Sequence, residues 1–496
     1  MLKERTVTRD LLKDAGLFRA VAQVGGEWIA STPPGHYTLR NPADDSVLVE
    51  LPRFKEAETD AAIEVAHAAF LSWRKVTAKE RSDVLRRWYE LMLAHRDDLA
   101  TLITLEEGKP LAEAKVEIDY AASFLQWFSE EAKRVRGDVI PAPKDGQRIV
   151  VLKEPIGVCA AITPWNFPAA MITRKAGPAL AAGCSMVVKP ASQTPLTALA
   201  LAELALRAGV PPGVFNVVTG NDTRAIGNRL TGHPLVRKVT FTGSTEVGRL
   251  LLAQASATIK KCSMELGGNA PFIVFDDADL DAAADGVVAA KFRNTGQACI
   301  SANRILVQSG VHDAFAAKLV ERVARLRVGN GLEPDMQLGP LIDDAAVAKV
   351  EEHIANAVAA GARVLHGGGR HALGGRFFEP TVLAGATSDM ALACEETFGP
   401  LAPLFRFERE EDAIALANAT EFGLAAYLYS RDAARIWRVA AALETGMLGI
   451  NSGLISNEVA PFGGVKQSGL GREGSHYGIE EFLEVKYLCW GGLSDT

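Results

Sequence analysis

The sequence has few cysteines and no patterned set of metal ligands. Six cysteines are spread over 496 residues without paired spacing, which is typical of a reducing compartment rather than of a disulfide framework. Because no CxxC or HExxH pattern occurs, we predict no metal site. No run of about 18 uncharged apolar residues occurs either, which argues against a membrane-spanning helix. The start, Met1 to Arg5, lacks an apolar segment, so we expect no signal peptide and a cytoplasmic location.

Neither sign of charge forms a block. The 53 basic and 60 acidic residues give a net charge of -7 and are interspersed, so neither a nucleic-acid groove nor a polybasic membrane patch is predicted. A chain of this length buries a large core and is long for one domain. We therefore expect a soluble globular protein of two or three domains whose partner is a small molecule, with no nucleic acid and no membrane.

The first third of the chain predicts helices followed by a hairpin. Residues 59–136 predict three helices, the second opening at Thr77 with Glu80 three positions later, which is a capping box. Residues 138–152 predict two extended pieces around a turn at Asp145. This hairpin is either an arm that extends a neighbouring subunit's sheet or a plain surface hairpin.

From Pro155 onward short apolar strands alternate with helices. Such a run of βαβ units predicts a doubly wound parallel sheet, in which ligands bind beyond the carboxyl ends of the strands. One helix is expected to begin with Thr194 as its cap and Pro195 in its first turn. A second α/β region follows Gly268. The predicted strands are 156–162, 186–188, 214–218, 239–242, 271–275, 305–308, 401–407, 424–429 and 484–490.

Two features indicate a nucleotide ligand. Residues 243–248 form a glycine-flanked turn entering a helix, where free N–H groups suit a phosphate; a tight helix entry without a ligand is the alternative. Lys189 and Ser192 follow a strand, where a dinucleotide fold usually places an acid for the ribose diol. Because no acidic residue occurs in residues 185–202, these two side chains predict contact with a 2'-phosphate and favour NADP over NAD.

A thiol and a carboxylate supply the parts needed for covalent catalysis, a nucleophile and a base that activates water. Glu265 lies just before a pair of glycines, and Cys299 follows Gly296 in a loop of small residues, where a turn can expose sulfur. An inert buried thiol is the alternative for any single cysteine. That alternative suits Cys159 and Cys184, which lie in strand-like apolar runs.

In their order along the chain these motifs resemble the NAD(P)-dependent aldehyde dehydrogenase superfamily over nearly the whole length. Within it, the chain is most similar to the bacterial succinate-semialdehyde and glutarate-semialdehyde dehydrogenases. The motifs of the superfamily are residues 163–168, 189–192, 241–248, 265–268, 296–299 and 396–400, and those of the closer group are 173–175, 292–294 and 453–456.

The resemblance implies an α/β fold with a Rossmann-type doubly wound cofactor domain, an α/β catalytic domain and a β oligomerisation arm. The cofactor domain would comprise residues 1–129 and 149–264, the catalytic domain 265–466, and the arm 130–148 and 467–496. Members of the family are dimers or tetramers, so we expect a homo-oligomer, with a tetramer favoured.

The resemblance also implies a role for each motif residue. Cys299 would attack the aldehyde to form a thiohemiacetal, while the Asn166 amide and the Cys299 backbone N–H hold the oxyanion. Glu265 would activate the water that hydrolyses the thioester, and Lys175 would support proton movement or cofactor position. Glu396 would hold the nicotinamide ribose. The other implied cofactor-binding residues are Thr163, Pro164, Trp165, Lys189, Ser192, Gly243, Ser244, Gly248, Leu266 and Phe398. For Phe398 the alternative is that it is a core residue.

Three further residues match those that hold the carboxylate remote from the aldehyde in the semialdehyde dehydrogenases: Arg174, Arg293 and Ser456. A guanidinium binds a carboxylate through two charge-assisted hydrogen bonds, although a surface or salt-bridged position is the commoner fate of an arginine. Ser301 stands where several relatives have a second cysteine, so a disulfide switch at the nucleophile is not predicted.

The expected reaction is oxidation of succinate or glutarate semialdehyde to the dicarboxylate with NADP, NAD remaining an option, through a thioester on the cysteine. Three alternatives stay open. They are an aldehyde dehydrogenase of other specificity, a cysteine hydrolase that uses the same thiol and carboxylate, and a non-catalytic binding protein on this fold. The hydrolase is less favoured because all nine histidines lie outside the motifs.

Overall fold

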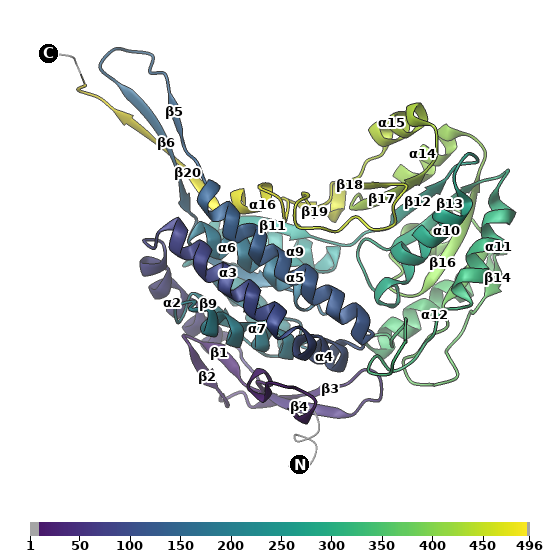
Figure 1. Cartoon of the computed structure of the whole chain (residues 1–496), viewed down its shortest axis with the longest axis horizontal. Helices are drawn as coiled ribbons and strands as arrows, with labels where there is room; N and C mark the ends of the chain where they lie inside the picture. The colour runs from purple at the N-terminus through teal and green to yellow at the C-terminus, as the bar shows by residue number, and fades with distance from the viewer. Residues whose placement is uncertain (1–8, 494–496) are drawn as a thin grey trace.

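The computed structural model describes residues 9–493. Two helix-covered sheets form two lobes, and a narrow third sheet projects from one of them as an arm (Figure 1). Residues 1–8, where the sequence predicts no signal peptide, and residues 494–496, the end of the predicted arm, lie outside the described chain. Within residues 9–493 no helix is long and apolar enough to cross a membrane.

The larger sheet has a parallel centre with antiparallel strands at its edges. Its strands are β1 (Ala22–Val24), β2 (Glu27–Ile29), β7 (Val158–Ile162), β8 (Ser185–Lys189), β9 (Phe215–Val217), β10 (Val236–Thr242), β11 (Lys261–Glu265) and β19 (Gly469–Leu470). Their order is β19-β11-β10-β7-β8-β9-β1-β2, with β11 through β9 parallel. The predicted doubly wound sheet is confirmed. The chain order reverses between β7 and β10, the switch point at which such sheets bind ligands.

Helices cover both faces of this sheet. They are α2 (Glu56–Trp73), α3 (Ala78–Ala94), α4 (Arg96–Glu107), α5 (Leu111–Glu131), α6 (Ala170–Ala182), α7 (Pro195–Ala208), α8 (Thr223–Gly232) and α9 (Thr245–Ala255). Along β7, Val158 and Ala160 belong to one buried cluster with α2, α8 and α9, whereas Cys159 and Ala161 belong to the other with α3, α5, α6 and α7. This alternation follows from the period of two along a strand. The prediction that Cys159 and Cys184 are core residues is confirmed.

Two expectations about the helices are corrected. The predicted second helix is two helices, because the chain leaves helical geometry at His95 (φ -107°, ψ 23°) between α3 and α4; its capping box at Thr77 is confirmed. Thr194 does not cap α7, since its hydroxyl has no partner in the part of the chain that is described. The carboxylate of Glu106, on α4, accepts hydrogen bonds from the first free N–H groups of α7 instead, at 2.6 and 2.8 Å.

The second lobe is a parallel sheet with one antiparallel edge. Its strands are β12 (Ala270–Val274), β13 (Ala302–Gln308), β14 (Arg363–His366), β15 (Thr381–Ala386), β16 (Leu401–Phe407), β17 (Ala425–Tyr429) and β18 (Met447–Ile450). Its helices are α10 (Leu280–Val287), α11 (His312–Val323), α12 (Asp344–Ala359), α13 (Ala391–Cys394), α14 (Glu410–Asn418) and α15 (Ala433–Ala442). The order is β14-β15-β16-β13-β12-β17-β18, and only β14 pairs antiparallel among these described strands. The strands predicted here are confirmed, whereas β14, β15 and β18 were not predicted.

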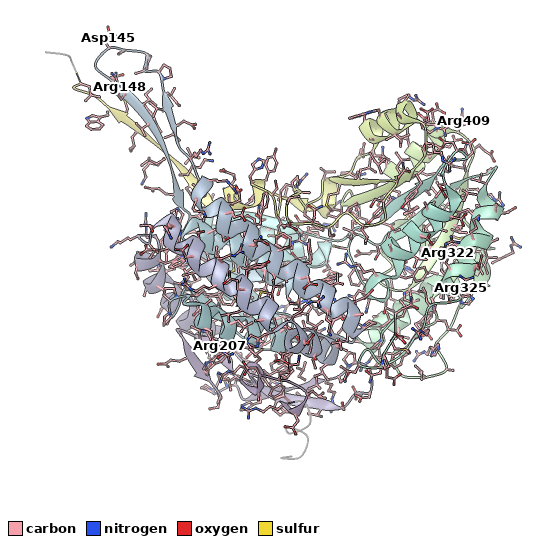
Figure 2. The ribbon with its side chains drawn as sticks, in the orientation of Figure 1. Asp145, Arg148, Arg207, Arg322, Arg325 and Arg409 are labelled. Carbon is pink, nitrogen blue, oxygen red and sulfur yellow. The ribbon has the colours of Figure 1, made fainter. Side chains whose placement is uncertain are left out.

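The projecting arm is an antiparallel sheet of β5 (Asp138–Ile140), β6 (Arg148–Pro155) and β20 (Leu483–Trp490), in the order β20-β6-β5. The predicted hairpin and final strand are confirmed. Figure 2 shows Asp145 and Arg148 near the tip of the arm, far from both lobes. The remaining elements are the ribbon β3 (His36–Arg40) and β4 (Val47–Pro52), and the short helix α16 (Tyr477–Glu480).

Candidate active site

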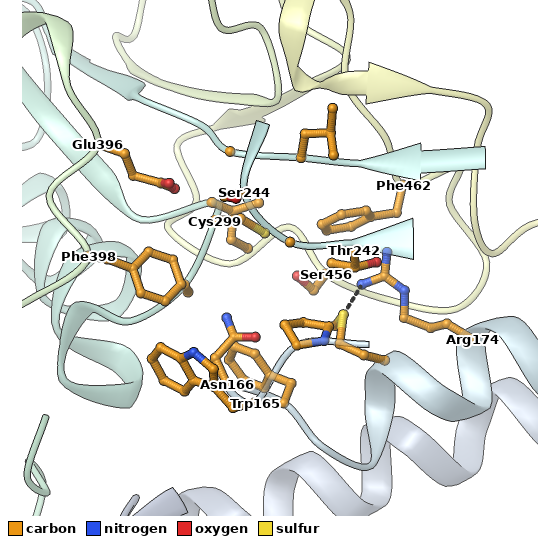
Figure 3. Close-up of a pocket in the computed structure, with 18 of the residues that line it drawn as sticks. Trp165, Asn166, Arg174, Thr242, Ser244, Cys299, Glu396, Phe398, Ser456 and Phe462 are labelled. Atoms are coloured by element: carbon orange, nitrogen blue, oxygen red, sulfur yellow. Dashed lines mark hydrogen bonds between the residues drawn. The ribbon is translucent and has the colours of Figure 1, made fainter. Parts of the chain in front are cut away.

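A pocket at the carboxyl ends of β7 and β10 is lined by residues of both lobes (Figure 3). Most of the residues that the sequence predicts for the site are brought together there. They are Pro164, Trp165, Asn166, Arg174, Gly243, Ser244, Leu266, Arg293, Cys299, Glu396, Phe398 and Ser456. Tyr120, Phe167 and Phe462 also line it. The sequence analysis assigned no role to these three residues, although Phe167 lies within the motif 163–168.

The other predicted site residues do not line this pocket. They are Glu265 and Lys175, which lie behind its wall, and Thr163, Lys189, Ser192 and Gly248, which lie along the carboxyl edge of the larger sheet or on α9. The backbone N–H of Thr163 donates to the Lys189 carbonyl at 3.1 Å, so the ends of β7 and β8 are joined. Gly248 packs against Leu266, where a side chain would overlap that leucine.

Residues 293–299, called the nucleophile loop after the role predicted for Cys299, have a strained backbone. The loop leaves a π-helical turn at residues 288–292, and Asn294 (φ 50°) and Thr295 (φ 56°) adopt left-handed conformations that are uncommon for residues other than glycine. The loop is held from outside, because the Ile342 N–H donates to the Gln297 side-chain oxygen at 3.0 Å. Cys299 is half-buried at the pocket wall. Burial, helped by the charge of Glu396, raises the pKa of the Cys299 thiol well above its ordinary value.

The Asn166 amide faces the same space. One of its N–H groups donates to the Gln297 carbonyl oxygen at 3.0 Å, which leaves the second N–H of the amide for a ligand. An amide N–H beside a thiol is the arrangement that stabilises an oxyanion during acyl transfer. The geometry is therefore suited to the predicted role of Asn166.

Gly267 and Gly268 allow their own segment to lie against the loops that carry Cys299 and Glu396. A methyl group at Gly268 would overlap the Cys299 carbonyl, and one at Gly267 would lie 3.1 Å from the Glu396 carboxylate. The Gly268 N–H donates to that carboxylate at 3.2 Å. Burial raises the pKa of Glu396 to about 7, although the Gly268 N–H opposes the rise. These glycines thus place the Glu396 carboxylate beside the nucleophile loop.

Glu265 is buried at the end of β11, and its carboxyl oxygens have no hydrogen-bond partner among residues 9–493. Burial, together with the charge of Glu473, raises the pKa of Glu265 well above its ordinary value, against the opposing charges of Arg174 and Lys175. A carboxyl group with a raised pKa is suited to general base catalysis near neutral pH. Because it does not line the pocket, its side chain must rotate before it can contact a water there.

Glu473 is an acidic residue that the sequence analysis did not identify. It forms buried ion pairs with Arg174, at 2.6 Å, and with Lys175, whose ammonium also donates to the Thr242 hydroxyl at 2.7 Å. These two charges outweigh burial and lower the pKa of Glu473. Its only sequence signal is an acid within a glycine-rich segment, residues 469–474.

The two arginines of the pocket differ in pairing. Arg174 forms an ion pair with Glu473, and its guanidinium lies 4.0 Å from the centroid of the Phe462 ring. Arg174 therefore lines the pocket but is salt-bridged, which was the alternative to its binding a substrate carboxylate. Arg293 has no carboxylate within ion-pair distance in residues 9–493 and stacks over the Phe167 ring at 4.8 Å. Arg293 is thus the cation whose charge is open to a ligand in the pocket.

The residues predicted for a nucleotide fit such a ligand. Lys189 is buried and donates to the Pro190 carbonyl at 2.6 Å, and burial lowers its pKa to about 8. Since no carboxylate pairs with it in the described chain, an anion would satisfy its charge. Ser244 caps the first turn of α9. Phe398 lies in the pocket rather than in the core and packs edge-on against Trp165, with ring centroids 5.6 Å apart.

A doubly wound lobe with a switch point that suits a nucleotide is joined to a second lobe that presents a thiol beside an amide donor, and this arrangement suits an enzyme that combines covalent catalysis with a nucleotide cofactor. The chain belongs to the aldehyde dehydrogenase family, whose model matches residues 28–488. It is 62% identical over 482 residues to the glutarate-semialdehyde dehydrogenase of Pseudomonas aeruginosa, covering 97% of this chain and 100% of that protein. It is also 62% identical over 480 residues to an Escherichia coli protein named succinate-semialdehyde dehydrogenase (NADP+), covering 97% and 99%.

A solved structure gives the same result for the fold. The crystal structure of succinate-semialdehyde dehydrogenase from Burkholderia pseudomallei superposes with a TM-score of 0.96 at 63% identity, covering 97% of this chain and 99% of that one. The predicted family, fold class and enzyme class are confirmed, and the protein is an aldehyde dehydrogenase. The family match decides against the cysteine hydrolase and the non-catalytic binding protein.

Proposed function

We propose that the protein oxidises succinate semialdehyde or glutarate semialdehyde to the dicarboxylate with NADP. The observation that carries the proposal is Arg293, a cation with no acidic partner in the described chain, which lines the same pocket as Cys299. Ser456 lines the pocket as well and adds a hydroxyl donor. An aldehyde with a remote carboxylate would pair with Arg293 while its carbonyl carbon meets the sulfur. The names of the two relatives that are 62% identical agree with this substrate class.

Each step of the proposed reaction uses residues of this site. The thiolate of Cys299 adds to the aldehyde carbon, and the Asn166 N–H donates to the oxygen that becomes negative. When bound, the oxidised nicotinamide supplies the acceptor for the hydride that leaves this carbon. The product on Cys299 is a thioester. Glu265, after turning toward the pocket, takes a proton from a water that attacks the thioester, which releases the carboxylic acid and the free thiol.

The proposed cofactor preference rests on Lys189 and Ser192. Lys189 is a buried cation without an acidic partner in the described residues, and no acid is available in residues 185–202 to bind a ribose diol. We assign Lys189 and Ser192 to the 2'-phosphate, the 243–248 turn to the pyrophosphate, and Glu396 to the nicotinamide ribose. NAD remains the weaker candidate, and the cytoplasmic location stays a prediction.

We further propose that the enzyme is a homo-oligomer, either a dimer or a tetramer, assembled through the arm formed by β5, β6 and β20. The arm has solvent-exposed hydrophobic side chains, including Val139, Val485, Tyr487 and Trp490, and its outer strands have unpaired edges. A second copy of the chain is the partner that would cover them.

The proposal is tested by following reduced-cofactor absorbance with a substrate panel. Succinate semialdehyde, glutarate semialdehyde and butanal are each measured with NADP+ and with NAD+. We expect the largest kcat/KM for a carboxylated aldehyde with NADP+. Equal kcat/KM for butanal and both carboxylated aldehydes contradicts the substrate class, and a preference for NAD+ contradicts the cofactor assignment.

Arg293→Ala sharpens this test. Loss of a charge-assisted contact costs roughly 2 to 4 kcal/mol, or about 30- to 1000-fold in kcat/KM, so we expect that loss on the semialdehydes and little change on butanal. Arg325→Ala is the matched control, since Arg325 lies on the surface (Figure 2) and pairs with Glu321. If Arg293→Ala lowers kcat/KM equally for the semialdehydes and for butanal, Arg293 supports the fold and does not bind the substrate.

A further inference from the structure

A buried ammonium outside the pocket contacts the main chain of the residue that carries the oxyanion amide. The side chain of Lys109, just before α5, is 1% exposed and pairs with the carboxylate of Glu117, also 1% exposed, at 2.6 Å. The Lys109 ammonium donates to the Asn166 carbonyl oxygen at 2.7 Å and lies 3.9 Å from the centroid of the Phe167 ring. A cation is retained at such a depth only with a close partner, because burial without one is costly.

The carboxylate of Glu117 has a second set of partners. Its other oxygen accepts hydrogen bonds from the Ala169 and Ala170 N–H groups at 2.9 and 3.4 Å, at the start of α6. A carboxylate at a helix N-terminus satisfies free N–H groups and the helix dipole. One ion pair at the start of α5 therefore fixes both Asn166 and the helix that follows it.

Asn166 is held on its other side by the nucleophile loop. The Asn294 side-chain amide donates to the same Asn166 carbonyl oxygen at 3.0 Å, while the Asn166 side chain donates to Gln297. The backbone N–H of Asn294 donates to Glu113, one turn before Glu117 on α5, at 2.9 Å. The start of α5 thus connects the oxyanion amide with the loop that carries the thiol.

We propose that Lys109, paired with Glu117, is a positioning residue that sets the direction of the Asn166 amide toward the developing oxyanion, an inference that rests on the proposed function. Lys109 lines no part of the pocket, so it acts through Asn166 and not on the substrate. An oxyanion donor works only where it is placed accurately, and a shift of about 1 Å costs on the order of 100-fold in rate.

Lys109→Met tests this inference in the full-length enzyme. We expect kcat for succinate semialdehyde to fall about 10- to 100-fold with KM changed less than about threefold, because substrate binding is left in place. Lys109→Arg, which keeps the charge and its donors, restores part of kcat. Lys238→Met is the matched control, since Lys238 is equally buried and pairs with Ser263 and Glu481 away from the pocket. Equal kcat in the Lys109→Met and Lys238→Met enzymes overturns the proposal.

A double-mutant cycle separates positioning from general support of the fold. In an Asn166→Ala background, Lys109→Met should cost no further rate, because no amide remains to be positioned. The same fold-loss in both backgrounds overturns the proposal. Because Lys109→Met leaves a buried carboxylate unpaired, the neutral pair Lys109→Met/Glu117→Gln replaces it in both measurements if the single variant does not fold. A wild-type enzyme with no activity on either semialdehyde contradicts the proposed function, whereas an active wild type with an unaffected Lys109→Met variant overturns the positioning role alone.

Discussion

At the scale of single residues, the site combines groups whose charged forms are disfavoured. Burial raises the pKa values of Cys299, Glu265 and Glu396, so the thiol favours its protonated form and the two carboxyl groups bind a proton more readily than exposed ones. Glu473 has the opposite shift, because Lys175 and Arg174 stabilise its charge. Reactivity of the thiol therefore requires help from a neighbouring base or from a ligand charge.

The raised pKa of Cys299 predicts its alkylation behaviour. Below its pKa the thiolate fraction of a cysteine increases about tenfold per pH unit. The rate at which iodoacetamide modifies Cys299 in cofactor-free enzyme should therefore increase about tenfold per pH unit between pH 7 and pH 9, without reaching a plateau. Peptide mass analysis measures the rate, and modification of exposed Cys394 in the same sample monitors the reagent. A plateau within this range would show that Cys299 is already ionised near neutral pH.

At the scale of elements, two loops of the candidate active site approach each other so closely that a glycine is required at their contact. Gly296 (φ 78°) lies so close to the segment 399–400 that a methyl group would overlap the Gly399 carbonyl. The nucleophile loop and the loop that bears Glu396 are therefore in direct backbone contact. Sequence reasoning predicted both loops, but the need for Gly296 arises from their contact and not from either loop alone.

Gly296→Ala should separate these loops. A left-handed conformation in a residue with a side chain, together with the overlap, costs roughly 2 to 5 kcal/mol, so we expect that loss in the free energy of unfolding in urea and a large loss of kcat. Gly232→Ala is the control, because a methyl group there meets open space and favours helix by up to about 1 kcal/mol. An unchanged unfolding curve for Gly296→Ala would contradict the close contact.

At the scale of the whole molecule, the two lobes supply different parts of one site and the arm supplies none. The larger sheet contributes Asn166 and the residues proposed for the nucleotide, the second lobe contributes Cys299 and Glu396, and the pocket lies where the two lobes meet (Figure 3). The arm points away from both lobes (Figure 1). Its open apolar strands have no partner within the described chain and would be covered in an oligomer.

Charged substitutions on the arm should therefore change assembly but not fold. Val485 and Tyr487 are 68% and 60% exposed on β20, and we expect Val485→Glu/Tyr487→Glu to lower the molar mass measured by light scattering while the unfolding curve changes little. Leu373→Glu, at a position 58% exposed in the second lobe, should leave the mass unchanged. The same mass for the arm variant and wild type contradicts assembly through the arm.

The sequence by itself determined the fold class, the family and most lining residues of the pocket, because these depend on short local patterns: strands with apolar runs, glycine turns, and motifs contained in a few residues. It did not determine pairings between distant segments. Glu473 meets Lys175 from 298 positions away, Glu106 caps a helix 90 positions away, and Lys109 reaches Asn166 across 57. Whether Arg174 is free or paired, whether Glu265 faces the pocket, and which buried cation contacts the Asn166 carbonyl oxygen were decided by the tertiary structure. The reason is physical: an unpaired buried charge is costly, and packing of the whole chain decides which partner, if any, lies beside it.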